Sequence, residues 1–381
     1  MTIWFEKQKY LLDYTVSSLM RRLAKNIGLL MVYALIVFIL ATVMLFTHAL
    51  RQEAAVVLDG APEVTVQHIT MGRHDVIPAA HIDKLSNMRG VRNVHGRLWG
   101  YFYDTANRAN YTLMVPSSDR YGQSPAQGEV VVGAGVARSR NVQVGQYLFL
   151  LSPRAKLFKL KLKEILHTDS EIVTTDLVLV SEPDFRTFFG LPEGIYTDLV
   201  LTVRNPKEVA KVAEKISAIL PDSRVITRND ILRTYDSVFD WREGILLALL
   251  AGAILAFVIF AWEKASGLGA QERREIGILK AIGWETSDVI KMKVWEGGVI
   301  SFGAFTLGYV LAYVHVFYFS AGLLEPVLKG WAVLYPRFEL SPQVDGFQVA
   351  ALLFFTVVPY IAATLVPIWR AAITDPDAVM R

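Results

Sequence analysis

Four long blocks of this sequence contain no Asp, Glu, Lys or Arg, and they restrict the fold more than any other feature. They are residues 27–47, 244–262, 297–324 and 347–369. An α-helix rises about 1.5 Å per residue, so each block can cross about 30 Å of hydrocarbon. Soluble proteins rarely contain uncharged helices of this length. We therefore predict a membrane protein with four transmembrane helices.

The segments between the blocks have their own predicted roles. We expect a cytoplasmic amphipathic helix in residues 1–26, a periplasmic α/β domain in 48–243, a cytoplasmic coupling segment in 263–296, a short periplasmic loop in 325–346 and a cytoplasmic tail in 370–381. The fold class is membrane α-helical with a mixed α/β domain inserted between helices 1 and 2. We predict two subdomains in that domain, one formed from both ends of the segment and the other inserted near residues 115–175.

Basic residues give the expected orientation. They are frequent in residues 1–26 and 263–296, whereas the loop 325–346 has only Lys329 and Arg337. Basic residues beside membrane spans favour the cytoplasm. We therefore expect a protein of the bacterial inner membrane, with both termini on the cytoplasmic side and the large domain in the periplasm. Positive and negative charges nearly cancel in that domain, so no nucleic-acid partner is expected.

The large domain alternates strand-like and helical patterns. Alternating or continuous apolar runs predict strands at residues 63–69, 99–103, 111–115, 129–132, 147–151, 157–165, 176–180 and 198–203. Asn205 and Pro206 are typical of a helix start, so we predict a helix over residues 206–220. With the strands at 198–203 and 224–227, this helix makes a βαβ-like unit.

The N-terminal residues predict an interfacial helix. Five apolar and aromatic side chains can share one face of it at helical spacing, with basic residues elsewhere: Trp4, Tyr10, Leu11, Tyr14 and Leu19. Such a helix would lie on the inner leaflet before the first span.

Residues 263–296 predict a short amphipathic helix followed by a helix that continues into the third span. A polar turn, Glu272 to Glu275, precedes Ile276, and Gly283 stands where a helix end favours a left-handed residue. Thr286 or Ser287 is expected to cap the second helix. Composition alone is also compatible with a solvated interfacial loop.

Several stretches resemble one family. QERREIGILKAIGW, followed by Glu296-Gly297, is similar to the signature of the FtsX-like/MacB-type permeases. The C-terminal IWRAAITDPDAVMR and the external GEVVVGAGVARSRNVQVGQYLFL and DLVLVSEPDFRTFFGLPEG resemble other segments of that family. One span before and three after a large domain also match its layout.

The resemblance implies the permease subunit of a type VII ABC system, which works by mechanotransmission. Two permeases, expected to be a homodimer, would pair with two copies of an ABC ATPase and act on a periplasmic or envelope client such as a lipoprotein or peptide. Export of a small hydrophobic or haem-like compound and regulation of a periplasmic hydrolase are the alternatives. The ATPase-contacting positions implied are Glu272, Arg273, Arg274, Glu275, Lys280, Gly283 and Trp284.

Nucleotide chemistry is expected in the partner. The sequence has no G-x-x-x-x-G-K-[ST] motif, so ATP and Mg²⁺ would be bound by a separate ATPase, and this chain would be a non-catalytic subunit. Gly133-Ala-Gly135 lacks the third glycine of a dinucleotide fingerprint. The absence of cysteine excludes disulfides and thiolate sites.

Other candidate sites have simpler interpretations. His68, Met71, His74 and His81 could bind a metal, but their spacings match no compact ligand set, so surface histidines are favoured. His315, in the third span, is either an interfacial imidazole or a functional group. A basic row at Lys159, Lys161 and Lys163 could attract an acidic ligand, although solvated or edge-protecting lysines are the usual explanation.

Small residues predict a close helix contact. Ala248, Gly252 and Ala256 repeat every four residues on the second predicted span, and Ala304 and Gly308 make a shorter version on the third. Such stripes let two helices approach closely in lipid. The stripe predicts a dimer face, with packing inside the chain as the alternative.

Overall fold

The computed structural model divides the chain into two compact units. The membrane unit comprises Met1–Ala49, Asp240–Ala321 and Pro342–Arg381, and the outer unit comprises Leu50–Phe239 and Gly322–Ser341. The structure describes residues 2–59, 61–117, 124–166, 171, 173–266, 270–330, 332–336 and 340–373.

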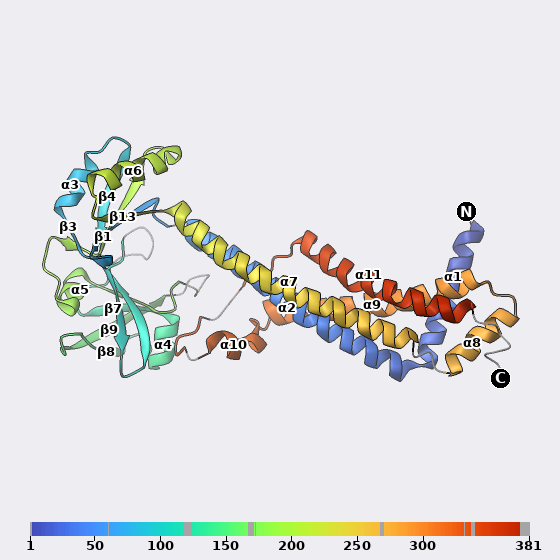
Figure 1. Ribbon diagram of the computed structural model, residues 1–381. Coiled ribbons are helices and arrows are strands. Elements are labelled where there is room, and N and C mark those ends of the chain that lie inside the picture. The colour runs from blue at the N-terminus through green and yellow to red at the C-terminus, as the bar shows by residue number, and fades with distance from the viewer. Residues whose placement is uncertain are drawn as a thin grey trace. The chain divides into compact units, whose positions relative to one another are not determined.

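Long helices dominate the membrane unit (Figure 1). They are α1 (Thr2–Arg21), α2 (Leu23–Asp59), α7 (Arg228–Ser266), α8 (Ala270–Ala281), α9 (Thr286–Phe317) and α11 (Gly346–Ile373). Among the described residues, three segments are long and apolar enough to span a membrane: Leu23–Ala54, Thr286–Phe317 and Gly346–Leu365. The second predicted span falls within α7, whose described apolar stretch is Leu250–Ile259. The count of four spans therefore remains a prediction.

Helix α9 packs against its neighbours along much of its length. Ile300, Ala304 and Ala312 on one side of it are buried. At Gly308, an added Cβ would lie 2.5 Å from the Ala34 carbonyl oxygen of α2. The glycine therefore permits close contact between α9 and α2, and at Gly308 the structure favours the alternative of packing inside the chain.

The stripe on α7 has different surroundings. Gly252 is exposed, and a Cβ added to it would meet no described atom within 4 Å. The neighbouring Ala253 and Phe257 are buried instead, and Phe257 stacks on Tyr33 of α2 with ring centroids 4.8 Å apart. Ala256 is half-buried, and the side chain of Ala248 lies outside the described part of the structure. This face of α7 is therefore open at Gly252.

The first sheet of the outer unit joins strands from both ends of its long segment. Its order is β13 (Ser223–Thr227), β1 (Val64–Thr70), β12 (Asp198–Val203) and β4 (Val91–Arg97), with β2 (Arg73–Asp75) paired to β1. The helices α3 (Ala80–Ser86) and α6 (Val209–Ile219) contribute Leu85, Val212 and Ile216 to its core. Strands β12 and β13 are the two strands of the predicted βαβ unit. Both pair antiparallel with β1, which lies between them in the sheet.

The second sheet is built from the middle of the segment. Its order is β5 (Trp99–Asp104), β6 (Ala109–Met114), β10 (Leu177–Val180), β7 (Glu129–Gly133), β9 (Leu157–Leu166) and β8 (Tyr147–Leu151). The helices α4 (Ala134–Arg140) and α5 (Glu182–Phe189) pack on one face through Val136, Phe185 and Phe188. Leu334 of the later loop also packs there.

Short elements complete the outer unit. They are β3 (Ile77–Pro78), paired with β11 (Ile195–Tyr196), the 3₁₀ helices η1 (Pro206–Glu208) and η2 (Gly322–Leu324), and α10 (Glu325–Lys329). Asn205 accepts a hydrogen bond from the Lys207 N–H, so the predicted helix start is confirmed. The inserted sheet starts at β5, earlier in the chain than the expected residue 115.

A buried carboxylate joins the two sheets. Asp198 of β12 is fully buried and accepts hydrogen bonds from Arg97 Nε at 2.8 Å and Nη2 at 2.7 Å. Trp99, the first residue of β5, donates its indole N–H to the same carboxylate at 2.9 Å. Since Arg97 ends β4 in the first sheet and Trp99 begins the second, Asp198 fixes the junction between them.

We expect Asp198→Ala to lower the stability of the outer unit by about 3 kcal/mol, because it removes one partner of a largely buried ion pair. Urea titration of the full-length protein, read out by pulse proteolysis, would measure the change. Asp222→Ala, at an exposed position in the same sheet region, is the matched control. Equal midpoints for the two variants would contradict the role given to Asp198.

Candidate coupling site

The predicted short helix and its turn are confirmed. Helix α8 ends at Ala281, and Gly283 adopts a φ of 101°. The Trp284 N–H returns to the Leu279 carbonyl at 3.0 Å and closes the helix end. Helix α9 starts at Thr286, with Glu285 at its N-cap position and no side-chain capping bond, so the predicted cap by Thr286 or Ser287 is wrong.

One face of α8 is buried against its own chain. Ile276 packs with Val289 of α9, and Leu279 packs with Met292 of α9 and Leu11 of α1. All five of these side chains are at most 4 % exposed. Trp284 borders both clusters. Because these contacts are tight, α8 and the first turns of α9 are expected to move as one body.

Glu275 is held by the N-terminal helix. Its carboxylate accepts hydrogen bonds from the Tyr14 hydroxyl at 3.0 Å, from Arg21 at 2.5 Å and from Arg22 at 2.7 Å. Burial, and then the charge of Glu275, raise the pKa of the Tyr14 hydroxyl above its usual value. Arg21 also lies over the Tyr14 ring, 5.5 Å from its centroid. We call these four side chains the Glu275 clamp.

The clamp is a feature that sequence reasoning missed. Residues 14–22 and 275 are far apart in the chain, so no local spacing links them. The adjacent Arg21 and Arg22 are the only signal that could have suggested an acidic partner. The prediction that Glu275 contacts an ATPase remains a prediction, and in the structure its carboxylate is engaged within the chain.

The other predicted coupling residues differ in exposure. Arg274 and Gly283 are exposed, and Lys280 and Trp284 are half-buried. The side chains of Glu272 and Arg273 lie outside the described part of the structure.

Two exposed apolar residues accompany Arg274, one on α8 and one directly after its last residue. Ile278 is 48 % and Ile282 69 % exposed. Residues four apart lie on the same face of a helix, so Arg274, Ile278 and Ile282 form one continuous stripe. We call it the outer stripe of α8. Ile278 and Ile282 were not among the residues predicted to contact an ATPase, and this apolar pair adds area that a partner protein can bury.

A buried ion pair follows on α9. Lys293 Nζ lies 2.6 Å from Glu296 Oε2, and both side chains are at most 10 % exposed. A Cβ added to the adjacent Gly297 would lie 3.1 Å from the Tyr360 ring of α11. The Glu296-Gly297 pair therefore marks the place where α9 and α11 pack closely.

Helix α1 packs differently from the prediction. Leu11, Thr15 and Ser18 are buried, whereas Tyr10 is 71 % exposed. Thr15 Oγ1 lies 3.5 Å from the Met292 carbonyl oxygen of α9. Tyr10 and Leu11 therefore do not share one face, and the inward side of α1 fits α8 and α9.

The candidate metal ligands are separately engaged. His74 bonds the Thr197 carbonyl at 3.0 Å and stacks near Trp99, while His81 bonds the Pro78 carbonyl at 3.2 Å. His68 lies 3.4 Å from Thr70 Oγ1, and Met71 is 98 % exposed. In the part of the chain that the structure describes, no group of three His, Cys, Asp or Glu side chains could hold a metal.

The remaining motifs have structural explanations. A Cβ added to Gly133 or Gly135 would overlap residues 174–175, so these glycines allow a close approach of two chain segments. His315 is buried, with its ring 5.5 Å from the Phe38 ring of α2.

The basic row is exposed, but β9 lies between β7 and β8. Lys159, Lys161 and Lys163 therefore lie on an inner strand of the sheet, and the strand at this edge is β8.

Two sequence comparisons show which known proteins the chain is similar to. Residues 243–376 match the model of the FtsX-like permease C-terminal region. An uncharacterized ABC transporter permease of Methanocaldococcus jannaschii is 22 % identical over 338 residues, covering 80 % of this chain and 81 % of the relative.

Two solved structures are similar to part of the chain. The extracellular domain of the noncanonic ABC-type transporter YknZ from Gram-positive bacteria has a TM-score of 0.31 and 10 % identity, covering 43 % of this chain and 99 % of that domain. The periplasmic region of MacB from Actinobacillus actinomycetemcomitans has a TM-score of 0.33 and 8 % identity, covering 46 % and 94 %.

The two sequence matches agree with each other. One covers the region that contains α8, α9 and α11, and the other extends over most of the chain. Residues 243–376 therefore match the FtsX-like permease C-terminal region, and the chain is similar to an ABC transporter permease over most of its length.

Proposed function

We propose that this permease couples ATP hydrolysis by a separate ATPase to movement of its outer unit, as the subunit of a type VII ABC system. The observation that carries the proposal is the two-sided character of α8. Its outer stripe is exposed, while Ile276 and Leu279 on the other side are buried against α9 and α1. A helix with this division can bind a partner and pass a displacement to the helices behind it.

A continuous set of contacts is available for that displacement. Ile276 meets Val289, near the start of α9. Further along α9, Gly297 meets Tyr360 of α11, and Gly308 meets Ala34 of α2. Close packing transmits strain because interiors have little free volume. Helix α2 then leads along the chain into β1 of the outer unit.

The proposed assembly contains two ATPases and two copies of this chain. The ATPase would bind ATP and Mg²⁺. It would contact Ile278 and Ile282 together with the predicted coupling residues Glu272, Arg273, Arg274, Lys280, Gly283 and Trp284. The open face of α7 at Gly252 would meet the second copy. The client would be a lipoprotein, a peptide or another envelope component.

The coupling test uses two copies of the permease and the ATPase in nanodiscs. Since the chain has no native cysteine, Ser217→Cys can carry one fluorophore on each outer unit. We expect energy transfer between the two labels to change when ATP is bound to a hydrolysis-deficient ATPase, and to return with ADP. Unchanged transfer during normal ATP turnover would contradict mechanical coupling.

Orientation is tested with single cysteines. A membrane-impermeant thiol reagent added to spheroplasts should label Ser217→Cys in α6 and leave Ser287→Cys at the start of α9 unlabelled, because basic residues place the second position inside. Both serines are exposed, so accessibility of the side chain does not limit the reaction. Labelling of position 287 in intact spheroplasts would show that the orientation is opposite to the predicted one.

A further inference from the structure

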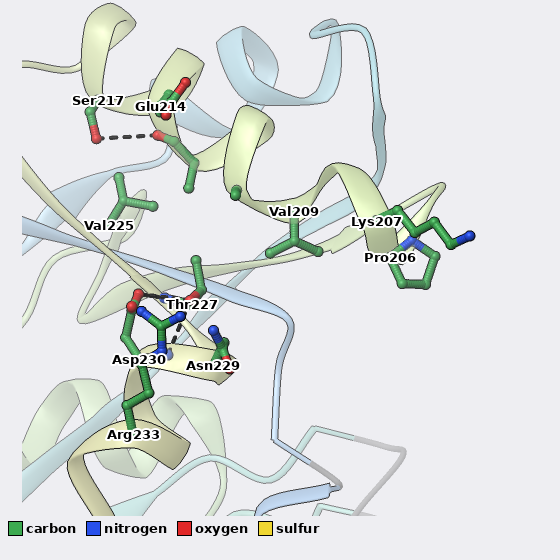
Figure 2. A pocket seen from close by; sticks show the side chains of 12 residues that line it. Pro206, Lys207, Val209, Glu214, Ser217, Val225, Thr227, Asn229, Asp230 and Arg233 are labelled. Carbon is green, nitrogen blue, oxygen red and sulfur yellow. Dashed lines mark hydrogen bonds between the residues drawn. The ribbon is translucent and has the colours of Figure 1, made fainter. Parts of the chain in front are cut away.

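The outer unit has a groove beside the edge strand β13. Its volume is about 700 Å³, and it is bordered by α6, β13 and the first turns of α7. Figure 2 shows Glu214 and Ser217 on the α6 side, Asp230 and Arg233 on the α7 side, and Val225 between them. The groove has the size of an ordinary ligand site, which is about 300–1,000 Å³.

The main chain of β13 faces this groove at Val225. The Ile69 N–H donates to the Asp222 carbonyl at 2.9 Å, and the Arg228 N–H donates to the Glu63 carbonyl at 3.0 Å. Hydrogen-bonded pairs alternate with non-bonded pairs in an antiparallel ladder. Val225 pairs with Val66 between the bonded positions, so its N–H and C=O point away from β1. Since β13 ends the sheet, these groups point to the open edge.

The start of α7 closes one end of that edge. Thr227 donates its main-chain N–H to Asp230 Oδ2 at 2.9 Å, and the Asp230 N–H lies 3.2 Å from Thr227 Oγ1. This reciprocal arrangement is a capping box with Asp in place of Glu. The capping box uses the outward N–H of Thr227 and leaves Val225 as the central position for an added strand.

The α6 wall leaves room for side chains. Ala210, Ala213 and Ser217 line the groove, and all three are small. Lys207 lies at the end of the groove near the start of η1, and Glu214 lies toward the other end (Figure 2). The groove therefore offers opposite charges at its two ends and a mainly uncharged wall between them.

We propose that this groove binds an extended segment of a partner polypeptide, which adds a strand to β13. Main-chain hydrogen bonds at Val225 would provide affinity, and small apolar side chains of the segment would fit against Ala210 and Ala213. An acidic residue would pair with Lys207 and a basic residue with Glu214. A compact small molecule fits less well, because such sites have polar groups that converge on one point. This proposal does not depend on the proposed coupling to an ATPase.

The probe is a fluorescein-labelled hexapeptide, Asp-Val-Ala-Val-Ala-Lys. Its reversed sequence is tested as well, because the added strand can run parallel or antiparallel to β13. Six residues at about 3.3 Å each span the length of β13. Fluorescence anisotropy with the purified full-length permease in nanodiscs should show saturable binding of one direction. The same peptide with both alanines replaced by proline loses two N–H donors and should bind at least about tenfold more weakly.

Two variants test whether the peptide binds in the groove. Val225→Pro removes the outward N–H but no ladder hydrogen bond, and proline is tolerated on edge strands. Ala213→Phe fills the groove, whereas Ala218→Phe makes the same change at an exposed neighbour that does not line it. We expect both groove variants to weaken binding about tenfold or more, with Ala218→Phe unchanged. Binding that resists both groove variants, or no binding of either peptide by the native protein, would overturn the proposal.

Discussion

Glu275→Lys is expected to lower permease-stimulated ATP hydrolysis by at least about tenfold. Three hydrogen bonds from Tyr14, Arg21 and Arg22 converge on this carboxylate. Hydrogen bonds to charged groups contribute about 1.5–3 kcal/mol each, and the lysine replaces attraction to two arginines with repulsion. Because 1.4 kcal/mol corresponds to a factor of ten, losing one such bond is sufficient for the expected effect. The measurement is ATP turnover by the co-purified ATPase in nanodiscs.

A charge swap distinguishes two explanations of that loss. If Glu275 acts through the clamp, Arg21→Glu with Arg22→Glu in the Glu275→Lys background should recover most of the stimulation. If Glu275 contacts the ATPase directly, as the family resemblance implies, the swap should recover none. Glu285→Lys, an exposed charge reversal beside the same helix, is the control and should change stimulation little. Normal stimulation in Glu275→Lys itself would show that the clamp has no part in coupling.

The coupling helix was predictable because its signals are local. The apolar spacing of Ile276 and Leu279 predicts which side of α8 is buried, and a single glycine predicts its end. The clamp was not predictable, since it depends on the packing of α1 against a helix that follows more than 250 residues later. The exposure of Ile278 and Ile282 was also not predictable from the sequence, because apolar side chains are usually expected to be buried.

The outer unit shows the same division between local and tertiary information. Strands with apolar alternation, such as β9, were predicted at nearly their observed bounds. Strand β4 was missed because its sequence, VRNVHGR, is mostly polar, and only Val91 and Val94 are buried. Its strand conformation comes from pairing with β12, and that pairing brings Arg97 to Asp198.

Small-residue stripes show a limit of sequence reasoning. Gly252 and Gly308 occupy similar patterns on two apolar helices, and the pattern alone assigns both to the same kind of contact. The structure separates them, since Gly308 faces α2 of its own chain and Gly252 faces open space among the described residues. A helix pattern predicts that a close contact is possible, and the tertiary packing decides which helix makes it.

Gly308→Leu is therefore expected to damage the folded membrane unit itself. A Cβ at this position would lie 2.5 Å from the Ala34 carbonyl oxygen, 2.8 Å from Val37 Cβ and 3.0 Å from the Phe38 nitrogen. Two of these three atoms belong to the main chain, so a rotamer change cannot relieve the overlap. Overpacking of this kind typically costs about 1–3 kcal/mol, and contact with main-chain atoms favours the upper end. Unfolding of the purified permease in mixed micelles of increasing SDS content should show the loss.

Gly252→Leu is the matched substitution, and it should leave that unfolding curve unchanged. A Cβ there meets none of the described residues within 4 Å, so the effect of the leucine is expected in the assembly. If α7 forms the dimer face, Gly252→Leu should yield a monomeric permease that still inserts, as measured by light scattering in detergent. Cross-linking at Ala248→Cys should also be lost in this variant. A dimeric Gly252→Leu protein without any cross-link at position 248 would exclude the α7 stripe as the interface, whereas normal stability of Gly308→Leu would contradict the close packing of α9 on α2.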